Sequence, residues 1–536
     1  MNFRITSEGI AIILIVMLSF SIRAFYVPSF PLASDESIYT YSYFAISKGV
    51  VPYRGIQLSS VPLSYLIYAF IIKIVGPNLY SLRLINIVFF VATVYLTYLL
   101  AKTLLRGQKG AGILGLLSAL LYAFYPMLIP YSIGVDPEFI LTFFALSSVI
   151  IYVAASRSKN NIPYFLVGVL MGLAVLTKLT AIYFLSALLL YHVGVMFLDK
   201  KYRAKVSQAM TMLLGFSVPI AVFLVWVTFS CGALRQFYLQ AFYWQTVRFP
   251  VSFGERLATI QFSTQFYVMF VVLGLLGSIF LARMAREPER RQLILPVWLS
   301  SVTVAAIIIL TPVIFAHYFF FLTPYFAILS SACFFCIGSL LYNSKQNRVV
   351  TKYKFAIVSV LLILVVLSAS AVAIWQVPLA APFFQPVESP WTRVVFYTGH
   401  YIATIDSSEK MWTSDGAIAF FAGKLIVPPN STDWPLPAFY TDAFGYSYDQ
   451  PKSDEMRDYK QGLVSLSQFT ESWEKEHVKV IVIIRGTGWI PYPDELMWAG
   501  IHGQEGVANY VQSKYELRQA ITIPEVPYTY EVWVRR

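Results

Sequence analysis

Four carboxylates in two short, widely separated segments are the side chains of this sequence best suited to chemistry. They are Asp35 and Glu36, and then Asp136 and Glu138. Acids are rare in this part of the chain, since residues 1–375 contain only nine Asp and Glu. A partly desolvated carboxylate has a raised pKa, and a second carboxylate nearby raises it further, which suits a general base for a hydroxyl nucleophile. The two segments therefore predict a site of acid–base chemistry if the fold brings them together.

Each acidic pair also has a structural explanation. Ser34 can serve as an N-cap that places Asp35 and Glu36 in the first turn of a helix, where each acid complements the helix dipole by about 0.3–1 kcal/mol. Asp136 followed by Pro137 is a common way for a helix to begin. Taken singly, each pair favours this structural role. Function is indicated by their occurrence at one membrane face, because ionisable groups close to the hydrocarbon are costly.

The composition excludes an ordinary soluble enzyme. The 536 residues are 57% hydrophobic and 13% charged, with a mean hydropathy of +0.64, which is typical of a polytopic membrane protein. The net charge of +12 does not indicate nucleic-acid binding, because it arises from the membrane part: residues 1–375 carry 27 Lys and Arg, whereas residues 376–536 are net acidic. Of the three cysteines, Cys333 and Cys336 lie in an apolar run, so no disulfide framework or zinc site is predicted.

Apolar windows of about 17–25 residues predict the membrane-spanning helices. Every second connection between them is rich in Lys and Arg, which marks the cytoplasmic side. The N-terminus is therefore predicted to be cytoplasmic, and segments 28–81 and 230–263 are predicted to be extracytoplasmic. The first window continues through Arg23 without a clear cleavage site, so it is expected to be a retained anchor. The eleven expected windows are 8–27, 82–104, 111–129, 136–156, 162–177, 179–198, 206–229, 264–283, 293–311, 318–341 and 355–375.

The fold class expected is a mainly α, polytopic membrane protein of about 11 transmembrane helices followed by a soluble α/β domain. Residues 1–375 form the membrane domain, whose outer segment predicts two helices, Asp35–Ser47 and Pro62–Val75. Residues 376–536 form the extracytoplasmic domain. Its short β-rich runs and one helix-like stretch are at Val478–Ile484, Tyr528–Val534 and Leu466–Glu476.

Basic side chains on the predicted outer face complement the acids. Several of them around one cleft would suit a phosphate, which Arg binds bidentately and Lys binds as a point charge. For Arg83 and Lys178 this function is favoured, whereas a lone histidine is more often structural. For Arg235, Arg248 and Arg256, snorkelling at an aromatic membrane interface is favoured instead. The outer-face candidates are Arg54, Arg83, Lys178, Arg235, Arg248, Arg256 and His317.

Seven short motifs, in this order along the chain, resemble those of the GT-C membrane glycosyltransferases. Within that superfamily the resemblance is closest to the branch of protein O-mannosyltransferases and lipid A aminoarabinose transferases, and it covers residues 8–341. Val61-Pro62 departs from the proline pair often found in relatives. The motifs are Asp35-Glu36, Val51-Pro52-Tyr53-Arg54, Pro62-Leu63-Ser64-Tyr65-Leu66, Leu82-Arg83-Leu84, Asp136-Pro137-Glu138, Leu176-Thr177-Lys178 and His317-Tyr318.

The resemblance implies a polyprenyl-phosphate-linked sugar as donor, a hydroxyl acceptor on a lipid, glycan or protein, and an inverting displacement at the outer face of the plasma membrane. Asp35, paired with Glu36, would be the general base, and Asp136 and Glu138 would position the acceptor or support the base. No cofactor or metal site is expected, and a requirement for a divalent metal is left open. The donor phosphate would be held by residues from among Arg54, Arg83, Lys178, Arg248, Arg256 and His317.

A transporter or flippase of a phosphate-bearing lipid is the main alternative. Such proteins commonly show internal repeats, broken helices and polar residues near the middle of the membrane. The sequence shows no evident repeat, and its acids cluster at one surface, so glycosyl transfer is favoured.

Overall fold

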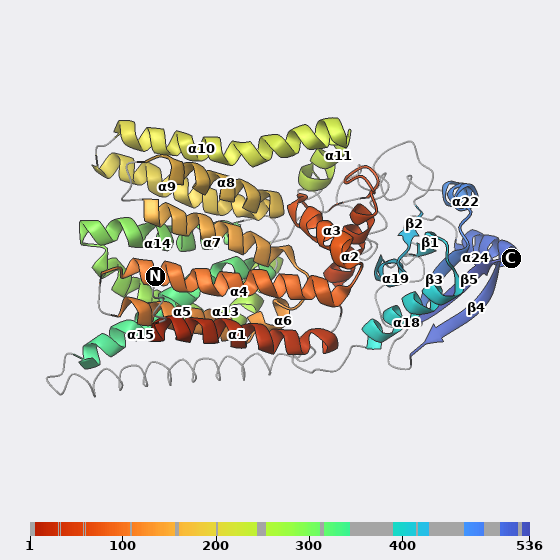
Figure 1. The fold of residues 1–536 in the computed structure, drawn as a ribbon, viewed down its shortest axis with the longest axis horizontal. Helices are drawn as coiled ribbons and strands as arrows, with labels where there is room; N and C mark the ends of the chain where they lie inside the picture. The colour runs from red at the N-terminus through yellow and green to blue at the C-terminus, as the bar shows by residue number, and fades with distance from the viewer. Residues whose placement is uncertain are drawn as a thin grey trace.

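The protein is mainly helical, and Figure 1 shows its long helices side by side in one bundle with a smaller domain at one end. This arrangement confirms the predicted fold class. The computed structural model describes residues 6–30, 32, 34–56, 58, 60–107, 110–155, 160–199, 202–243, 253–310, 316–342, 390–413, 416–427, 466–486, 504–523 and 528–536.

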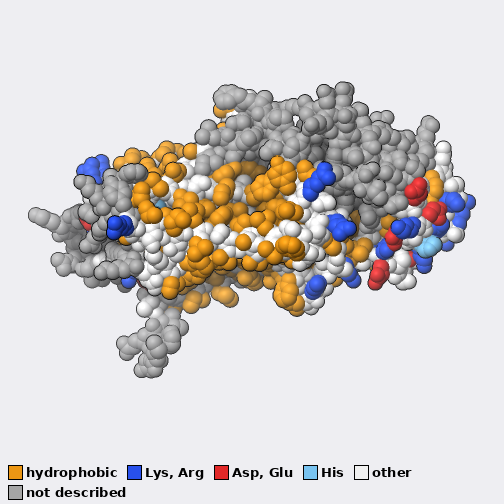
Figure 2. All heavy atoms as spheres, turned by 90° about the horizontal axis from the view of Figure 1, so that it is seen from above, with side chains coloured by type: hydrophobic (Ala, Val, Ile, Leu, Met, Phe, Trp, Pro, Cys, Tyr) orange, Lys and Arg blue, Asp and Glu red, His pale blue; other side chains and the backbone are white. Residues whose placement is uncertain are grey.

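The bundle is built from apolar helices that bury one side against each other and expose the other. On the face drawn in Figure 2, hydrophobic side chains cover the helical part of the molecule, with Lys and Arg at both ends of this apolar area. Leu14, Phe25 and Val222 are among the exposed members, at 62%, 78% and 65% exposure, which is the pattern expected of side chains that face lipid. The bundle helices are α1 (Ser7–Tyr26), α4 (Leu79–Leu104), α5 (Ala111–Phe124), α7 (Pro137–Ala155), α8 (Ile162–Thr177), α9 (Ile182–Asp199), α10 (Tyr202–Val225), α13 (Phe253–Met284), α14 (Pro288–Leu310) and α15 (Thr323–Tyr342).

Six segments among the described residues are long and apolar enough to cross a membrane, and each overlaps a predicted window. Windows 111–129 and 162–177 correspond to the shorter apolar helices α5 and α8, window 264–283 to the apolar end of α13, and window 293–311 to α14. Window 355–375 lies outside the described residues, so the count of eleven stays a prediction. The six are Ser7–Ser29, Leu79–Leu104, Pro137–Ala155, Leu179–Met196, Arg203–Ser230 and Tyr318–Cys336.

Glycines allow two pairs of bundle helices to pack at very short range. A Cβ atom at Gly168 of α8 would lie 2.0 Å from the carbonyl oxygen of Met212, and one at Gly215 of α10 would lie 2.1 Å from that of Phe165. A Cβ atom at Gly277 of α13 would lie 1.7 Å from a carbonyl oxygen of α15. Small residues are enriched at membrane helix interfaces because they let backbones approach closely.

Two helices cap the end of the bundle that faces the C-terminal domain (Figure 1). They are α2 (Ser34–Ser47) and α3 (Leu63–Val75), which confirm the two helices predicted for the outer segment. Glycine at position 76 ends α3 with a φ of +80°, a conformation that favours glycine. Asn78 then caps α4, since its side chain accepts a hydrogen bond from the Ser81 N–H at 3.1 Å. These caps fix where α3 turns into α4.

The C-terminal domain contains one mixed five-stranded sheet in the order β2-β1-β3-β5-β4. Strand β1 is parallel to β2 and β3, whereas β5 lies antiparallel between β3 and β4. The predicted strands at 478–484 and 528–534 are confirmed as β3 and β5, and the predicted helix at 466–476 as α22. The strands are β1 (Lys410–Thr413), β2 (Leu425–Ile426), β3 (Val480–Gly486), β4 (Tyr515–Thr522) and β5 (Tyr528–Arg535), and the helices are α18 (Pro390–Ile405), α19 (Gly416–Ala422), α22 (Leu466–Lys475) and α24 (Gln504–Lys514).

One hydrophobic cluster joins this domain to the outer helices. Its buried members include Phe44 of α2, Tyr68 of α3, Phe420 of α19 and Val482 of β3. The outer helices therefore share a core with the domain as well as with the bundle. The predicted boundary at 375–376 lies outside the described residues.

Candidate functional site

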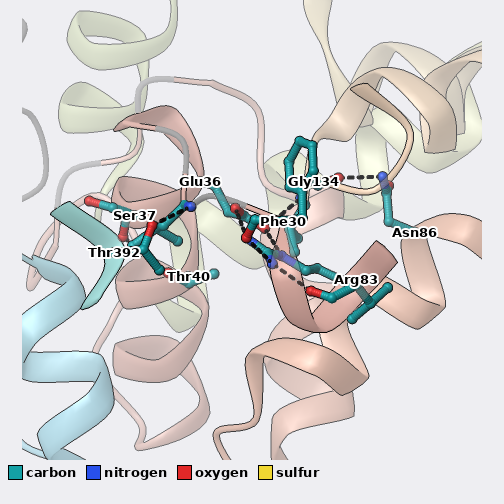
Figure 3. Close-up of polar contacts among 11 residues, drawn as sticks. Phe30, Glu36, Ser37, Thr40, Arg83, Asn86, Gly134 and Thr392 are labelled. Atoms are coloured by element: carbon teal, nitrogen blue, oxygen red, sulfur yellow. Dashed lines mark hydrogen bonds and ion pairs between the residues drawn. The ribbon is translucent and has the colours of Figure 1, made fainter. Parts of the chain in front are cut away.

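The first acidic segment begins α2 and is fixed by a buried ion pair (Figure 3). Oε1 and Oε2 of Glu36 accept hydrogen bonds from Nε and Nη2 of Arg83, at 2.9 and 2.7 Å. Both side chains are at most 2% exposed. The remaining nitrogen of Arg83, Nη1, donates to the carbonyl oxygens of Val27 and Phe30, at 3.0 and 2.8 Å. Such a bidentate, charge-assisted pair holds the end of α1, the start of α2 and the start of α4 in one geometry.

The second acidic segment lies directly against the first. The backbone N–H of Val135, the residue before Asp136, donates to Oε1 of Glu36 at 3.0 Å. Asn86 of α4 holds the same turn, because its Nδ2 donates to the carbonyl oxygens of Ser132 and Gly134, at 3.2 and 2.5 Å (Figure 3). The two acidic segments, which are 100 residues apart in the sequence, therefore form one site, as the sequence analysis required.

Arg23 of α1 also holds the turn before Asp136, through a hydrogen bond to Ser132. Its Nε donates to Ser132 Oγ at 2.5 Å, Nη1 to Ser19 and Nη2 to the carbonyl oxygen of Ala123, and its guanidinium lies 3.9 Å from the centre of the Phe90 ring. Arg23 is fully buried, and none of the ion pairs found among the described residues includes it. Its charge is satisfied by hydroxyl and carbonyl oxygens and by an aromatic face.

A second buried ion pair lies at the other side of the site. Nζ of Lys178, which follows α8, pairs with Oε1 of Glu138 in the first turn of α7. The ammonium group also lies 5.0 Å from the centre of the Tyr318 ring. Burial lowers the pKa of Lys178, but the charges of Glu138 and Asp136 raise it by more, so its pKa lies above the ordinary lysine value. Lys178 is therefore a charged group close to both acids of the second turn.

Tyrosines from α2 and α3 cover the acidic turns. The ring of Tyr43 stacks on that of Tyr68 with 4.7 Å between their centres, and Tyr65 packs edge-on against Tyr43 at 5.4 Å. Burial, and then the charges of Asp136 and Glu36, raise the pKa of Tyr68 well above its ordinary value. The Tyr68 hydroxyl donates to Oδ1 of Asn86 at 3.1 Å, so α3 is also tied into the network.

Of the remaining predicted residues, the structure describes the side chains of some and only the backbone of others. Asp35 lies in the first turn of α2, immediately before Glu36, but its side chain lies outside the described residues. Arg54 is exposed in the loop after α2, and its Nη1 lies close to Gly232 after α10. Arg248 lies outside the described residues, as do the side chains of Arg256 on α13 and His317 on the 3₁₀ helix Ala316–Leu322.

The predicted roles of Glu36 in catalysis and of Arg83 in phosphate binding stay predictions. Because Glu36 and Arg83 neutralise each other in a buried ion pair, a structural contribution of both to the site is favoured.

Sequence reasoning missed Arg23 and Asn86. Arg23 could have been found, because a charge inside an apolar window is a signal of function. Across the ranges that the structure describes, no three His, Cys, Asp or Glu side chains gather as a metal site would require.

The helical bundle, its outer helices and the C-terminal sheet together have the architecture of a multi-pass membrane protein. Residues 59–229 match the sequence model of the dolichyl-phosphate-mannose-protein mannosyltransferase family. No curated protein matches the chain by sequence.

Two solved structures show the likeness over nearly the whole chain. ArnT from Cupriavidus metallidurans, bound to undecaprenyl phosphate, has a TM-score of 0.59 and 13% identity, covering 98% of each chain. The oligosaccharyltransferase AglB from Archaeoglobus fulgidus, in complex with an inhibitory peptide and a dolichol-phosphate, has a TM-score of 0.52 and 10% identity, covering 98% of this chain and 74% of that chain. These matches confirm the predicted resemblance to the GT-C superfamily of membrane glycosyltransferases.

Proposed function

We propose that this protein transfers a sugar from a polyprenyl-phosphate donor to a hydroxyl acceptor at the extracytoplasmic face of the plasma membrane. The observation that carries the proposal is the meeting of the two acidic turns, through the hydrogen bond from the Val135 N–H to Glu36, beside the charged Lys178. The bound undecaprenyl phosphate of ArnT and the mannosyltransferase model over residues 59–229 support the choice of donor.

In the proposed reaction the acceptor oxygen attacks the anomeric carbon while the bond from that carbon to the phosphate oxygen breaks. The electron pair of that bond leaves with the lipid phosphate, and the acceptor proton passes to a carboxylate. Attack opposite the leaving group inverts the anomeric configuration. We assign the base to Asp35, because the neighbouring Glu36 already binds Arg83 and the Val135 N–H. Asp136 and Glu138 position the acceptor or support the base.

Cations stabilise the phosphate as it leaves. Lys178 is our first choice, since it remains charged and its side chain is 14% exposed, against 1% for Arg83. Arg54, on the exposed loop after α2, is a second candidate, and Arg83 contributes mainly through Glu36. Arg248, Arg256 and His317 belong to segments next to this face in the predicted topology.

The charges at the two ends of the bundle support the proposed orientation. Lys102 lies in the last turn of α4, at the end that points away from α2 and α3, and Arg106 follows this helix. Arg283 lies in the last turn of α13, and Arg286 follows that helix. We place these basic segments in the cytoplasm and the acidic turns, with the C-terminal domain, outside.

The test uses purified protein in lipid nanodiscs with a radiolabelled polyprenyl-phosphate sugar and a panel of hydroxyl acceptors. Asp35→Asn should lower transfer by about a hundredfold to ten-thousandfold and leave unfolding in detergent unchanged. Glu287→Gln is the matched control, because this carboxylate is 60% exposed and, among the described residues, forms its ion pair with a near neighbour on the surface, Arg290. Near-normal turnover of Asp35→Asn would show that the base is misassigned. Movement of intact donor across the bilayer without transfer would favour the flippase alternative.

A further inference from the structure

The C-terminal domain contacts the chain directly before the first acidic turn. The backbone N–H of Leu32, three residues before Asp35, donates to Oγ1 of Thr392 on α18 at 2.8 Å (Figure 3). Leu32 is 4% exposed and Thr392 is 8% exposed. A buried N–H that loses its only acceptor costs free energy, so the hydroxyl of Thr392 fixes the position of this backbone.

The same domain contacts α2 again just after the acidic turn. The backbone N–H of Ile426 in β2 donates to the hydroxyl oxygen of Tyr41 at 2.9 Å. Gly416 at the start of α19 lies so close that a Cβ atom there would be 2.9 Å from Cβ of Tyr41. The rings of Phe44 and Phe420 meet edge-to-face with 6.2 Å between their centres. The domain therefore holds the chain on both sides of Asp35 and Glu36.

These contacts hold one particular stretch of backbone, which a contact that merely joined the two domains would not need to do. Leu32 belongs to the short connection between α1 and α2, where Arg83 already binds the carbonyl oxygens of Val27 and Phe30. Arg83 fixes this connection from the bundle side, and Thr392 fixes it from the domain side. The backbone that leads into Asp35 is thus held from two directions by groups far away in the sequence.

We propose that the C-terminal domain is part of the catalytic apparatus, with Thr392 as a positioning residue that sets the orientation of the turn carrying Asp35. This inference rests on the proposed function, because it assigns a role in the same reaction. A displacement of about 1 Å at a reacting group can lower a rate by about a hundredfold, so loss of one such contact is expected to affect kcat. Donor binding should change little, since Thr392 acts through the acidic turn.

The experiment compares three substitutions in the full-length protein in nanodiscs. Thr392→Val keeps the shape but removes the acceptor for the Leu32 N–H, whereas Thr392→Ser keeps the hydroxyl. Thr398→Val is the matched control, because Thr398 is a buried threonine of the same helix whose hydroxyl donates within α18, to the carbonyl oxygen of Val394 at 2.7 Å. Transfer kinetics and hydrogen–deuterium exchange of the peptide spanning residues 32–40 are measured for each.

We expect Thr392→Val to lower kcat by about tenfold with the donor KM within about twofold, a loss well inside the range for a small misplacement of a catalytic group. Exchange in residues 32–40 should become faster. Thr392→Ser and Thr398→Val should both stay close to the wild type in kcat and in exchange.

Three outcomes would overturn the inference. They are a normal kcat for Thr392→Val, equal losses for Thr392→Val and Thr398→Val, and a change in donor KM without a change in kcat. If the wild type itself transfers no sugar, the proposed function fails, and the exchange data alone then decide whether the domain orders the turn. Faster exchange in Thr392→Val but not in Thr398→Val would support that ordering, and unchanged exchange would exclude it.

Discussion

Removing one partner of the buried Glu36–Arg83 pair should destabilise the protein strongly, whereas removing both should cost much less. Either single substitution, Glu36→Gln or Arg83→Met, leaves a buried charge without its counter-charge, which costs about 3–5 kcal/mol of unfolding free energy. In the double variant both charges are removed, so no buried charge is left without its counter-charge. What remains is the loss of donors to the carbonyl oxygens of Val27 and Phe30, at about 1 kcal/mol each.

The two single losses therefore add to about 6–10 kcal/mol, while the double variant should lose about 2–3 kcal/mol. The assay is unfolding by sodium dodecyl sulfate in mixed micelles, analysed as a double-mutant cycle. Glu287→Gln and Arg290→Gln form the control cycle, since this pair is on the surface and should couple by less than about 1 kcal/mol. Additive losses at Glu36 and Arg83 would show that the two side chains do not form the pair, and the description of the site would be wrong.

Three further predictions concern other parts of the molecule. Glu138→Gln should destabilise the protein and weaken transfer. Because the pKa of Lys178 is raised, the stabilisation by its pair with Glu138 should be complete from near-neutral pH up to about pH 10 and should decline as pH rises further, measured by micelle unfolding across pH. Gly168→Ala should prevent close packing of α8 on α10 and abolish the folded protein in size-exclusion chromatography, whereas Gly194→Ala, where nothing lies within 4 Å, should be neutral or stabilise by up to about 1 kcal/mol. The side chain of Asp406 is only 6% exposed, which raises its pKa, but hydrogen bonds from Ser408 and Lys424 lower the pKa by more. Asp406→Asn should therefore destabilise the C-terminal domain near neutral pH, and this effect should decline as pH falls below the ordinary carboxyl range, as followed by tryptophan fluorescence.

The elements of the fold were largely predictable because hydropathy records which segments face lipid and which face water. The outer helices at 34–47 and 63–75 followed from cap residues and apolar spacing, and the strands around 480 and 530 from alternating β-rich runs. Helix α5 is shorter than its window of 111–129, because the chain turns at Tyr125, before the apolar composition ends. Hydropathy cannot register such a turn.

The partners of the polar side chains could not be predicted. Glu36 and Arg83 were each identified as functional, but periodicity does not say which buried cation meets which acid over 47 positions. The contact of Thr392 with Leu32 spans 360 positions and joins two regions that the sequence separates into different domains. The sequence could state only that the two acidic turns must lie close together if they form one catalytic site. Membrane topology places them on the same face but does not fix the distance between them.

The position of Arg23 has a consequence for how the chain is assembled. When α1 first enters the membrane, only one of the described partners of the Arg23 guanidinium is present, namely Ser19, because Ala123 and Ser132 are synthesised about a hundred residues later. Until then the long side chain must extend toward the lipid head groups. Helix α1 thus settles at its final depth only after α5 and the following turn have been made, so its position is fixed later than its own insertion.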